Sequence, residues 1–194
     1  MKSAIPVFAV AVSTFALPAA AQVSMSSTYA GASVGQADFK DGCQDVTGPG
    51  VSCDDKDTAW RIFGGYQFNR NFAAELGYHN LGEIRASNAF TGRTAKIKAS
   101  AGELVGVGLL PFADQFGAYG KLGLYYGKTE ATSNFGVSGD DTNTGVTWGI
   151  GLQYDPMPAL GLRVEWQQYH DIGGDNSGKG NINVLNLAAL WRFR

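Results

Sequence analysis

Histidine and net basic charge are both scarce in this 194-residue chain. There are two histidines, and 15 Lys and Arg stand against 17 Asp and Glu, which gives a formal net charge of −2. Nucleic-acid binders usually carry a basic footprint, so we expect no nucleic-acid partner. The residues also form no pattern of metal ligands, and we expect neither a metal ion nor a cofactor.

A long apolar run is missing from the body of the chain. No internal run approaches the ~20 apolar residues of a membrane helix. The apolar stretch 5–17 lies near the start, where it follows Lys2 and precedes the small residues 19–21. This is the pattern of a secretory signal peptide with its cleavage site. We therefore predict a signal peptide at residues 1–21 and a single mature domain at residues 22–194.

Cysteine is equally scarce, since Cys43 and Cys53 are the only two. Both follow the predicted signal peptide, and neither has a further Cys or His nearby that would complete a metal site. Exported proteins reach an oxidising compartment, where paired cysteines form disulfides. The sequence therefore favours a disulfide between Cys43 and Cys53 across one loop.

Glycine and aromatic residues are abundant instead. Glycine accounts for 27 of 194 residues, about twice its usual share of ~7%. In residues 60–82, large apolar side chains alternate with small or polar ones in two runs around the polar turn 69–71. Successive side chains on a strand point to opposite faces, so this pattern predicts a β-hairpin with one apolar face. That face carries Trp60, Ile62, Tyr66, Phe68, Phe72, Leu76 and Tyr78.

Eight such alternating segments follow the signal peptide, and their connections alternate in length. We expect long loops at the polar intervals, about 40–57, 83–93, 130–142 and 170–180, and turns of three to five residues between the other segments. Long loops at one end, short turns at the other and an even strand count are typical of bacterial outer-membrane barrels. The predicted fold is all-β, an eight-stranded antiparallel up-and-down transmembrane β-barrel in the outer membrane of a Gram-negative bacterium.

Charged residues lie on the face opposite the apolar set. The apolar face cannot meet water and is expected to meet lipid, so the charged side chains are expected to point into the barrel lumen. Glu103 lies in a segment whose alternation does not show clearly which side chains point outward and which point inward. We predict that it points inward because a carboxylate near the middle of a bilayer is costly. The predicted lumen charge network contains Arg61, Glu75, Glu103, Lys121, Arg163 and Glu165.

This network has more than one interpretation. Eight strands leave room for little beyond side chains, which favours a structural salt-bridge network that plugs the lumen. The alternative is a charged filter in a narrow, low-conductance porin-like channel. Paired carboxylates also suit acid/base catalysis, but no substrate-sized cleft is expected around them. We predict a protein without enzymatic activity.

Two other groups of residues suggest activities that we rank lower. His79 and His170 suggest a lipid-modifying outer-membrane enzyme, because such an enzyme needs a base beside a nucleophile. His79 is predicted to point inward, and His170 lies at a loop edge near Ser177 in a glycine-rich stretch. Acidic residues in the polar intervals suit divalent cations or surface ligands, although such residues are more often solvated loop charges. They are Asp54, Asp55, Asp57, Asp140 and Asp141.

Short motifs along the mature chain resemble the N-terminal barrel of the outer membrane protein A (OmpA) family. They read FGGYQFN from Phe63, ELGYHNLG from Glu75, KLG from Lys121, GLQYD from Gly151, LRVEWQ from Leu162 and LNLAALWRF from Leu185. The resemblance implies an eight-stranded barrel whose charged interior positions match Glu75, Lys121, Arg163 and Glu165.

The chain departs from that family in two respects. Gln153 stands where the family can place a Glu, and Val107 where it can place the matching Lys, so the resemblance implies that one interior ion pair is absent. We also expect that the periplasmic peptidoglycan-binding module of full-length members is absent, because the sequence ends at Arg194. The closing strand resembles the family's C-terminal recognition signal for the outer-membrane assembly machinery, but Arg194 follows the aromatic Phe193.

These observations predict a monomeric outer-membrane barrel with a structural or surface-interaction role. The expected partners are outer-membrane lipids and lipopolysaccharide, together with the assembly machinery that reads the C-terminal strand. No residue pattern identifies a solute, a ligand or a host partner.

Overall fold

The protein is described by a computed structural model that covers residues 27–40, 43, 50–134, 136, 138–174 and 178–193. The predicted signal peptide, Ser177 and Arg194 lie outside these residues. The elements are β1 (Ser27–Phe39), β2 (Val51–Asp54), β3 (Lys56–Gln67), β4 (Phe72–Asn88), β5 (Arg93–Pro111), β6 (Phe116–Ser133), β7 (Ser138–Met157), β8 (Leu160–Gly174) and β9 (Gly178–Phe193). The described part of the chain contains no helix long and apolar enough to cross a membrane.

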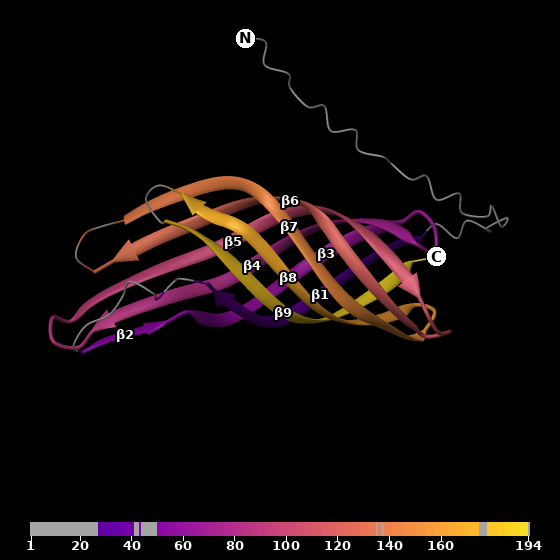
Figure 1. Ribbon diagram of the computed structural model, residues 1–194, viewed down its shortest axis with the longest axis horizontal. Helices are drawn as coiled ribbons and strands as arrows, with labels where there is room; N and C mark the ends of the chain where they lie inside the picture. Colours follow the sequence, from indigo (N-terminus) through magenta and orange to yellow (C-terminus); the bar gives the residue numbers. More distant parts are fainter. Residues whose placement is uncertain are drawn as a thin grey trace, which may run out of the picture.

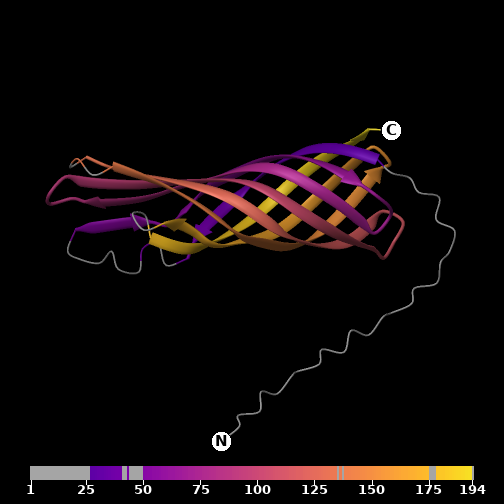
Figure 2. The same ribbon diagram turned by 90° about the horizontal axis from the view of Figure 1, so that it is seen from above.

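Eight of these strands form a closed antiparallel barrel (Figures 1 and 2). Each of β3 to β8 pairs with the next strand along the chain, and β1 pairs with both β3 and β9, which closes the ring. In the closing pair, Thr28 lies opposite Phe193 and Phe39 opposite Ile182. Closure gives every strand of the ring two neighbours, so none has to leave its backbone groups unpaired in lipid. The predicted all-β eight-stranded barrel is confirmed.

The strands exist because their side chains alternate between lipid and interior. On β3, Trp60 and Ile62 are exposed on the outer face while Arg61 and Phe63 are buried on the inner face. On β5, Leu104 is exposed and Glu103 is buried, so Glu103 points inward. Large apolar side chains cover the outside of the ring because a lipid solvent favours them there.

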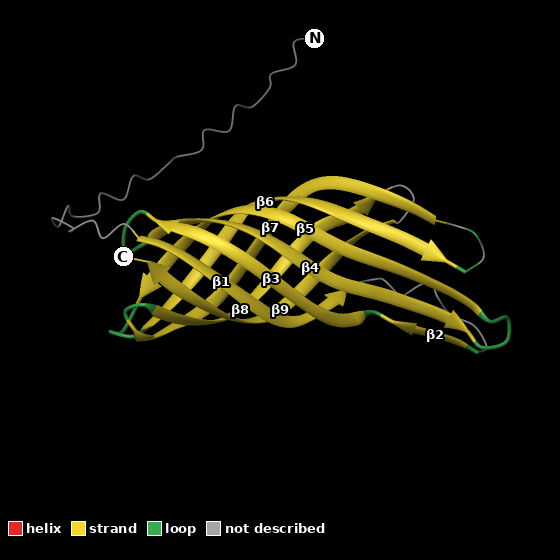
Figure 3. Ribbon diagram, turned by 180° about the vertical axis from the view of Figure 1, so that it is seen from behind, coloured by secondary structure: helices red, strands yellow, loops and turns green. Residues whose placement is uncertain are grey.

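Short turns connect the strands at one end of the barrel, as predicted (Figure 3). They comprise residues 68–71, 112–115 and 158–159. The first is closed by Asn69, whose Oδ1 accepts hydrogen bonds from the backbone N–H groups of Asn71 at 2.8 Å and Phe72 at 2.9 Å. Asn and Asp favour such turns because their side chains replace a missing backbone partner.

At the other end the expected loops are largely strand, which corrects the sequence-based prediction. Intervals 83–93, 130–142 and 170–180 are mostly paired as continuations of the flanking strands. Interval 40–57 contains β2, which pairs with Arg85–Asn88 of β4 beyond the point where β3 and β4 separate. Above the membrane both faces of a strand meet water, so pairing continues without the apolar alternation that identifies a strand in the sequence.

The predicted disulfide is present between Cys43 and Cys53, with an S–S distance of 2.00 Å. Cys53 lies on β2, and the bond ties this short strand to the chain that follows β1. Because β4 is the one strand that pairs with β2 among the described residues, the disulfide supplies a covalent attachment that the hydrogen-bond ladder alone does not give.

The barrel interior holds two apolar clusters. The cluster nearer the long-strand end contains Ala37, Phe39, Ala59, Leu81, Ala99, Ala101, Tyr125, Tyr169, Ile172, Ile182 and Val184. The cluster nearer the short turns contains Tyr29, Phe63, Ala73, Val105, Val107, Leu109, Tyr119 and Leu190. On β3 to β6 the charged interior residues fall between members of these two sets, for example Arg61 between Ala59 and Phe63. On β8 they lie opposite Ala188 and Asn186 of β9, between Val184 of the first cluster and Leu190 of the second.

Candidate functional site: a charged layer inside the barrel

Six charged side chains meet in the barrel interior, and they are the six that the sequence singles out. Arg61 comes from β3, Glu75 from β4, Glu103 from β5, Lys121 from β6, and Arg163 and Glu165 from β8. Each is at most 4% exposed. The set, which we call the charged layer, contains three cations and three anions. Burial of an ion is costly unless it is paired, and this layer supplies equal numbers of each sign.

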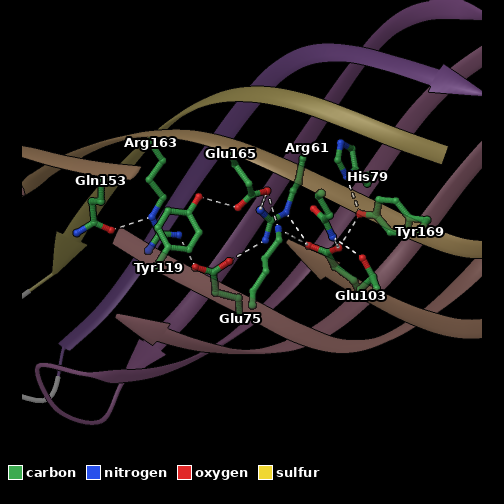
Figure 4. Close-up of polar contacts among 12 residues, drawn as sticks. Arg61, Glu75, His79, Glu103, Tyr119, Gln153, Arg163, Glu165 and Tyr169 are labelled. Atoms are coloured by element: carbon green, nitrogen blue, oxygen red, sulfur yellow. Dashed lines mark hydrogen bonds and ion pairs between the residues drawn. The ribbon is translucent and has the colours of Figure 1, made fainter. Parts of the chain in front are cut away.

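Arg61 is the centre of the charged layer (Figure 4). Its Nη2 lies 2.7 Å from Glu75 Oε2, its Nε 2.7 Å from Glu103 Oε1, and its Nη1 3.4 Å from Glu165 Oε1. The guanidinium therefore contacts a carboxylate from each of three strands. A planar group with several donors suits this position, whereas an ammonium would act only as a point charge.

The other two cations each have a closest carboxylate. Lys121 Nζ lies 2.6 Å from Glu165 Oε1 and 3.9 Å from Glu103 Oε1. Arg163 Nη1 lies 2.5 Å from Glu75 Oε1. Glu75 and Glu165 therefore each keep a close cation besides Arg61, while Glu103 has Arg61 as its only cation within 3 Å among the described residues.

Each carboxylate also accepts a hydrogen bond from one tyrosine. Tyr29 donates to Glu75 Oε1 at 2.8 Å, Tyr119 to Glu165 Oε2 at 2.8 Å, and Tyr169 to Glu103 Oε2 at 2.6 Å. Hydrogen bonds to an ionised acceptor are roughly twice as strong as neutral ones. These tyrosines are not among the site residues predicted from the sequence, although all three lie at inward-facing positions.

Glu103 has the most extensive set of neutral partners. Gln167 Nε2 donates to Glu103 Oε2 at 2.7 Å and to Thr147 Oγ1 at 2.8 Å. His79 Nδ1 lies 2.7 Å from the Tyr169 hydroxyl. That hydroxyl has a single proton, which goes to Glu103, so His79 must donate through Nδ1–H. His79 therefore orients Tyr169 and has no free Nδ1 lone pair with which to act as a base.

The layer ends toward the short turns at Gln153. Arg163 Nε donates to Gln153 Oε1 at 2.8 Å, and Gln153 Nε2 donates to Asp155 Oδ2 at 2.9 Å. Asp155 in turn lies 2.8 Å from Arg192 Nη2. Gln153 thus supplies hydrogen bonds without charge. Val107, which lies opposite Lys121 in the β5–β6 register, packs in the apolar cluster near the short turns.

The remaining candidate residues do not gather into a site. His170 is exposed, whereas His79 is fully buried. Asp57 accepts backbone N–H groups of Thr58 and Glu83, and Asp54 accepts that of Lys56. Within the residues that the structure describes, no group of three or more His, Cys, Asp or Glu side chains is placed to hold a metal ion.

Comparison with known proteins identifies the family of the chain and supports its fold. The model of the outer membrane protein beta-barrel domain family matches residues 7–193. The chain belongs to that family. Outer membrane protein A of Salmonella typhi is 28% identical over 205 aligned residues, which cover 100% of this chain and 56% of that protein. Outer membrane protein P5 of Haemophilus influenzae is 27% identical over 159 residues, or 75% of this chain and 44% of that one.

This outer membrane β-barrel protein spans about half the length of the curated relatives that it matches. Neisserial surface protein A aligns with a TM-score of 0.59 at 16% identity, over 86% of this chain and 97% of that one. The N-terminal barrel of Pseudomonas aeruginosa OprF aligns with a TM-score of 0.56 at 12% identity, over the same shares. These structures support the fold alone. Family and fold together place the protein in the outer membrane of a Gram-negative bacterium.

Proposed function

We propose that this protein is a non-enzymatic outer-membrane barrel with a structural and surface-interaction role, whose lumen is plugged by the charged layer. The observation that carries the proposal is the position of three cations and three anions, at most 4% exposed, between two apolar clusters. A permeant ion would have to cross both clusters and replace existing ion pairs. Taking one partner away from a buried ion pair costs ~3–5 kcal/mol, so the paired layer opposes passage.

The surface-interaction part of the proposal is supported by the opposite end of the barrel. Strands β4 to β7 continue well beyond the ring and form an extended sheet on the side of the longer connections (Figures 1 and 2). In outer-membrane barrels the long connections face the outside of the cell and the short turns face the periplasm. An ordered sheet of this kind gives a partner a fixed surface to contact.

We further propose a monomer that contacts lipid and lipopolysaccharide and reaches the membrane through the assembly machinery. The support is the outer face of β9, where Leu185, Leu187, Trp191 and Phe193 are all exposed. Aromatic residues near the ends of membrane strands suit the lipid–water interface. The predicted export by a signal peptide at residues 1–21 belongs to the same proposal.

Single-channel recording in planar bilayers tests the plug. Purified wild-type protein is expected to give no stable conductance steps. A variant that shortens the centre of the layer, Arg61→Ser with Glu103→Ser, is expected to give brief steps, because a contact that closes the lumen has been removed. Arg85→Ser, at an exposed site on the extension, serves as the control.

Two outcomes would contradict the plug. Stable steps from wild-type protein would favour the rival, a narrow low-conductance channel with the charged layer as its filter. Silence from both wild type and the shortened variant would mean that the apolar clusters close the lumen without the layer. The enzymatic alternative has a separate test, incubation with lipid A or phospholipid, in which acyl release or transfer would contradict a non-enzymatic role.

A further inference from the structure

The extended sheet above the barrel ends in β7. Its strand order is β2–β4–β5–β6–β7, and β5, β6 and β7 remain paired up to Ala95 with Ser133 and Thr132 with Ser138. On its other side β7 pairs with β8 only as far as Thr147 with Tyr169. Among the described residues, no strand therefore pairs with the second edge of residues 138–142.

Strand β8 has a β-bulge against β9 just beyond its last pair with β7. The β8–β9 register shifts between Tyr169 and Ile172, and Asp171 has a φ of 53°, in the left-handed region that Asp tolerates better than most residues. The side chain of Asn143 bridges the gap. Its Nδ2 donates to the Asp171 carbonyl at 2.6 Å, and its Oδ1 accepts the N–H of Gly173 at 3.2 Å. Asn143 thus links β7 to β8 through its side chain, beyond the last backbone pair of the two strands.

The open edge presents backbone groups of known identity. Asp155 N–H points toward β6, where it bonds to the carbonyl of Gln115 at 2.8 Å. The β6–β7 register is uninterrupted from Tyr154 to Ser138, and backbone groups on a strand alternate in direction. The even-numbered residues therefore direct their N–H and C=O groups away from β6. On the open segment these are Ser138, Asp140 and Thr142.

Asp140 and Asp171 bring negative charge to this edge, while Lys128 lies opposite Thr142 on β6 and is bound by Glu130. Asp140 is exposed on the outer face and has no ion pair within 4 Å among the described residues. Its cross-strand neighbour Glu130 is already bound by Lys128, whose Nζ lies 2.6 Å away. The hydrogen bond from Lys128 and its positive charge hold the pKa of Glu130 below its ordinary value. Asp171, across the gap, is also exposed.

We propose that residues 138–142 of β7 form a docking edge for an extended peptide segment of another protein, which adds a strand beside β7 and carries basic side chains. An unpaired strand edge is a template for such addition. Alternate side chains of the added strand lie beside those of β7, so a Lys or Arg opposite Asp140 gains an attraction. This inference rests on the surface-interaction part of the proposed function and is independent of the plug.

A second copy of this chain fits the edge poorly. Two copies in one membrane are related by an axis along the membrane normal, so their β7 strands would run in the same direction. The same rotation turns the outer faces of the two copies to opposite sides, so residues at equal height would point to opposite faces of the joined sheet, whereas paired strands keep neighbouring side chains on one face. The negative charge of Asp140 favours a basic partner of a different chain.

Amide hydrogen exchange on the isotope-labelled protein, folded in lipid nanodiscs, tests the proposal. The probe is a six-residue peptide that alternates Thr and Lys. One control peptide replaces Lys by Glu, and the other replaces Thr by Pro, which keeps the charge but removes strand-forming donors. The Thr–Lys peptide is expected to slow exchange at Asp140 and Thr142. Asp140→Asn is expected to weaken binding about 2–5-fold, the range of one exposed ion pair; Asp114→Asn, near the short turns, is the matched control with no expected change.

Several results would overturn the docking edge. They are no protection at millimolar peptide, equal protection by the Glu or the Pro peptide, and protection on β2 in place of β7. A Thr142→Cys variant that cross-links to a second copy would show that the edge binds another copy of this chain and not a different protein. None of these results bears on conductance, so failure here is distinguishable from failure of the plug.

Discussion

Replacing Arg61 by Met should destabilise the folded barrel by ~3 kcal/mol, at the lower end of the ~3–5 kcal/mol expected when one partner of a buried ion pair is removed. The substitution keeps an unbranched chain of similar length but leaves the charged layer with three anions and two cations. The substitution does not affect the three carboxylates equally, because each of them keeps different partners when Arg61 is removed.

The contacts indicate where the uncompensated charge falls. Without Arg61, Glu75 keeps Arg163 at 2.5 Å and Glu165 keeps Lys121 at 2.6 Å. Glu103 keeps only Lys121, at 3.9 Å, with hydrogen bonds from Tyr169 and Gln167. The distant lysine still attracts Glu103 by ~4 kcal/mol at an effective dielectric constant of about 20, which is why we expect the lower end of the range.

The double variant Arg61→Met with Glu103→Gln should therefore recover at least half of the loss. It restores equal numbers of cations and anions, and the amide keeps an oxygen for Tyr169. The assay is equilibrium unfolding in urea with the protein folded in lipid vesicles, which yields the free energy of unfolding from the linear dependence on denaturant. Gel mobility of unboiled samples reports whether each variant forms the barrel.

Arg85→Met is the control, because Arg85 pairs with Glu83 on the extension and its side chain is 63% exposed. An exposed pair contributes at most ~1 kcal/mol. If Arg61→Met lowers the free energy of unfolding no more than Arg85→Met does, water must screen the interior charges. The expected loss, which assumes a charged layer without water, would then be wrong. If the double variant is no more stable than Arg61→Met alone, Glu103 is not the residue left uncompensated.

Three other predictions use the same samples. Tyr169→Phe should cost ~1–3 kcal/mol of unfolding free energy, because a buried charged acceptor loses a donor; an unchanged value would contradict its role. Leu122→Arg on the lipid face should cost ~2–4 kcal/mol near the bilayer midplane, whereas Thr132→Arg on the extension should cost little. Replacing Cys43 and Cys53 by Ser should speed amide exchange in β2 while leaving barrel mobility on a gel unchanged, and altered mobility would refute a purely local role.

Much of the barrel is predictable because lipid imposes a strict rule on each strand. Every second side chain of a membrane strand must be apolar, so the parity of Trp60 and Ile62 also fixes that of Arg61. The same rule orients Glu103, whose own segment is ambiguous, because a lipid-facing carboxylate is excluded on energetic grounds.

The extension was not predicted because that rule does not apply above the membrane. Residues such as Thr132 and Asp140 belong to regularly paired strands, but these segments are polar. Their sequence therefore lacks the apolar alternation that distinguishes a strand from a loop. The bulge between Tyr169 and Ile172 was not predicted either, because no period in the sequence marks the positive φ of Asp171 or the hydrogen bonds from Asn143. The interior tyrosines were missed for another reason: Tyr169 and Tyr29 have the right parity, but aromatic residues are expected on the lipid face too.

The pairing of β1 with β9 also constrains the order of assembly. The first and last strands are neighbours in the ring, so their contacts join residues from opposite ends of the described chain. Contacts of such separation form slowly, because the intervening chain must first be ordered. Until β9 arrives, β1 has an open edge that lipid cannot satisfy. The ring can therefore become stable in the membrane only after synthesis of the chain has reached its final strand.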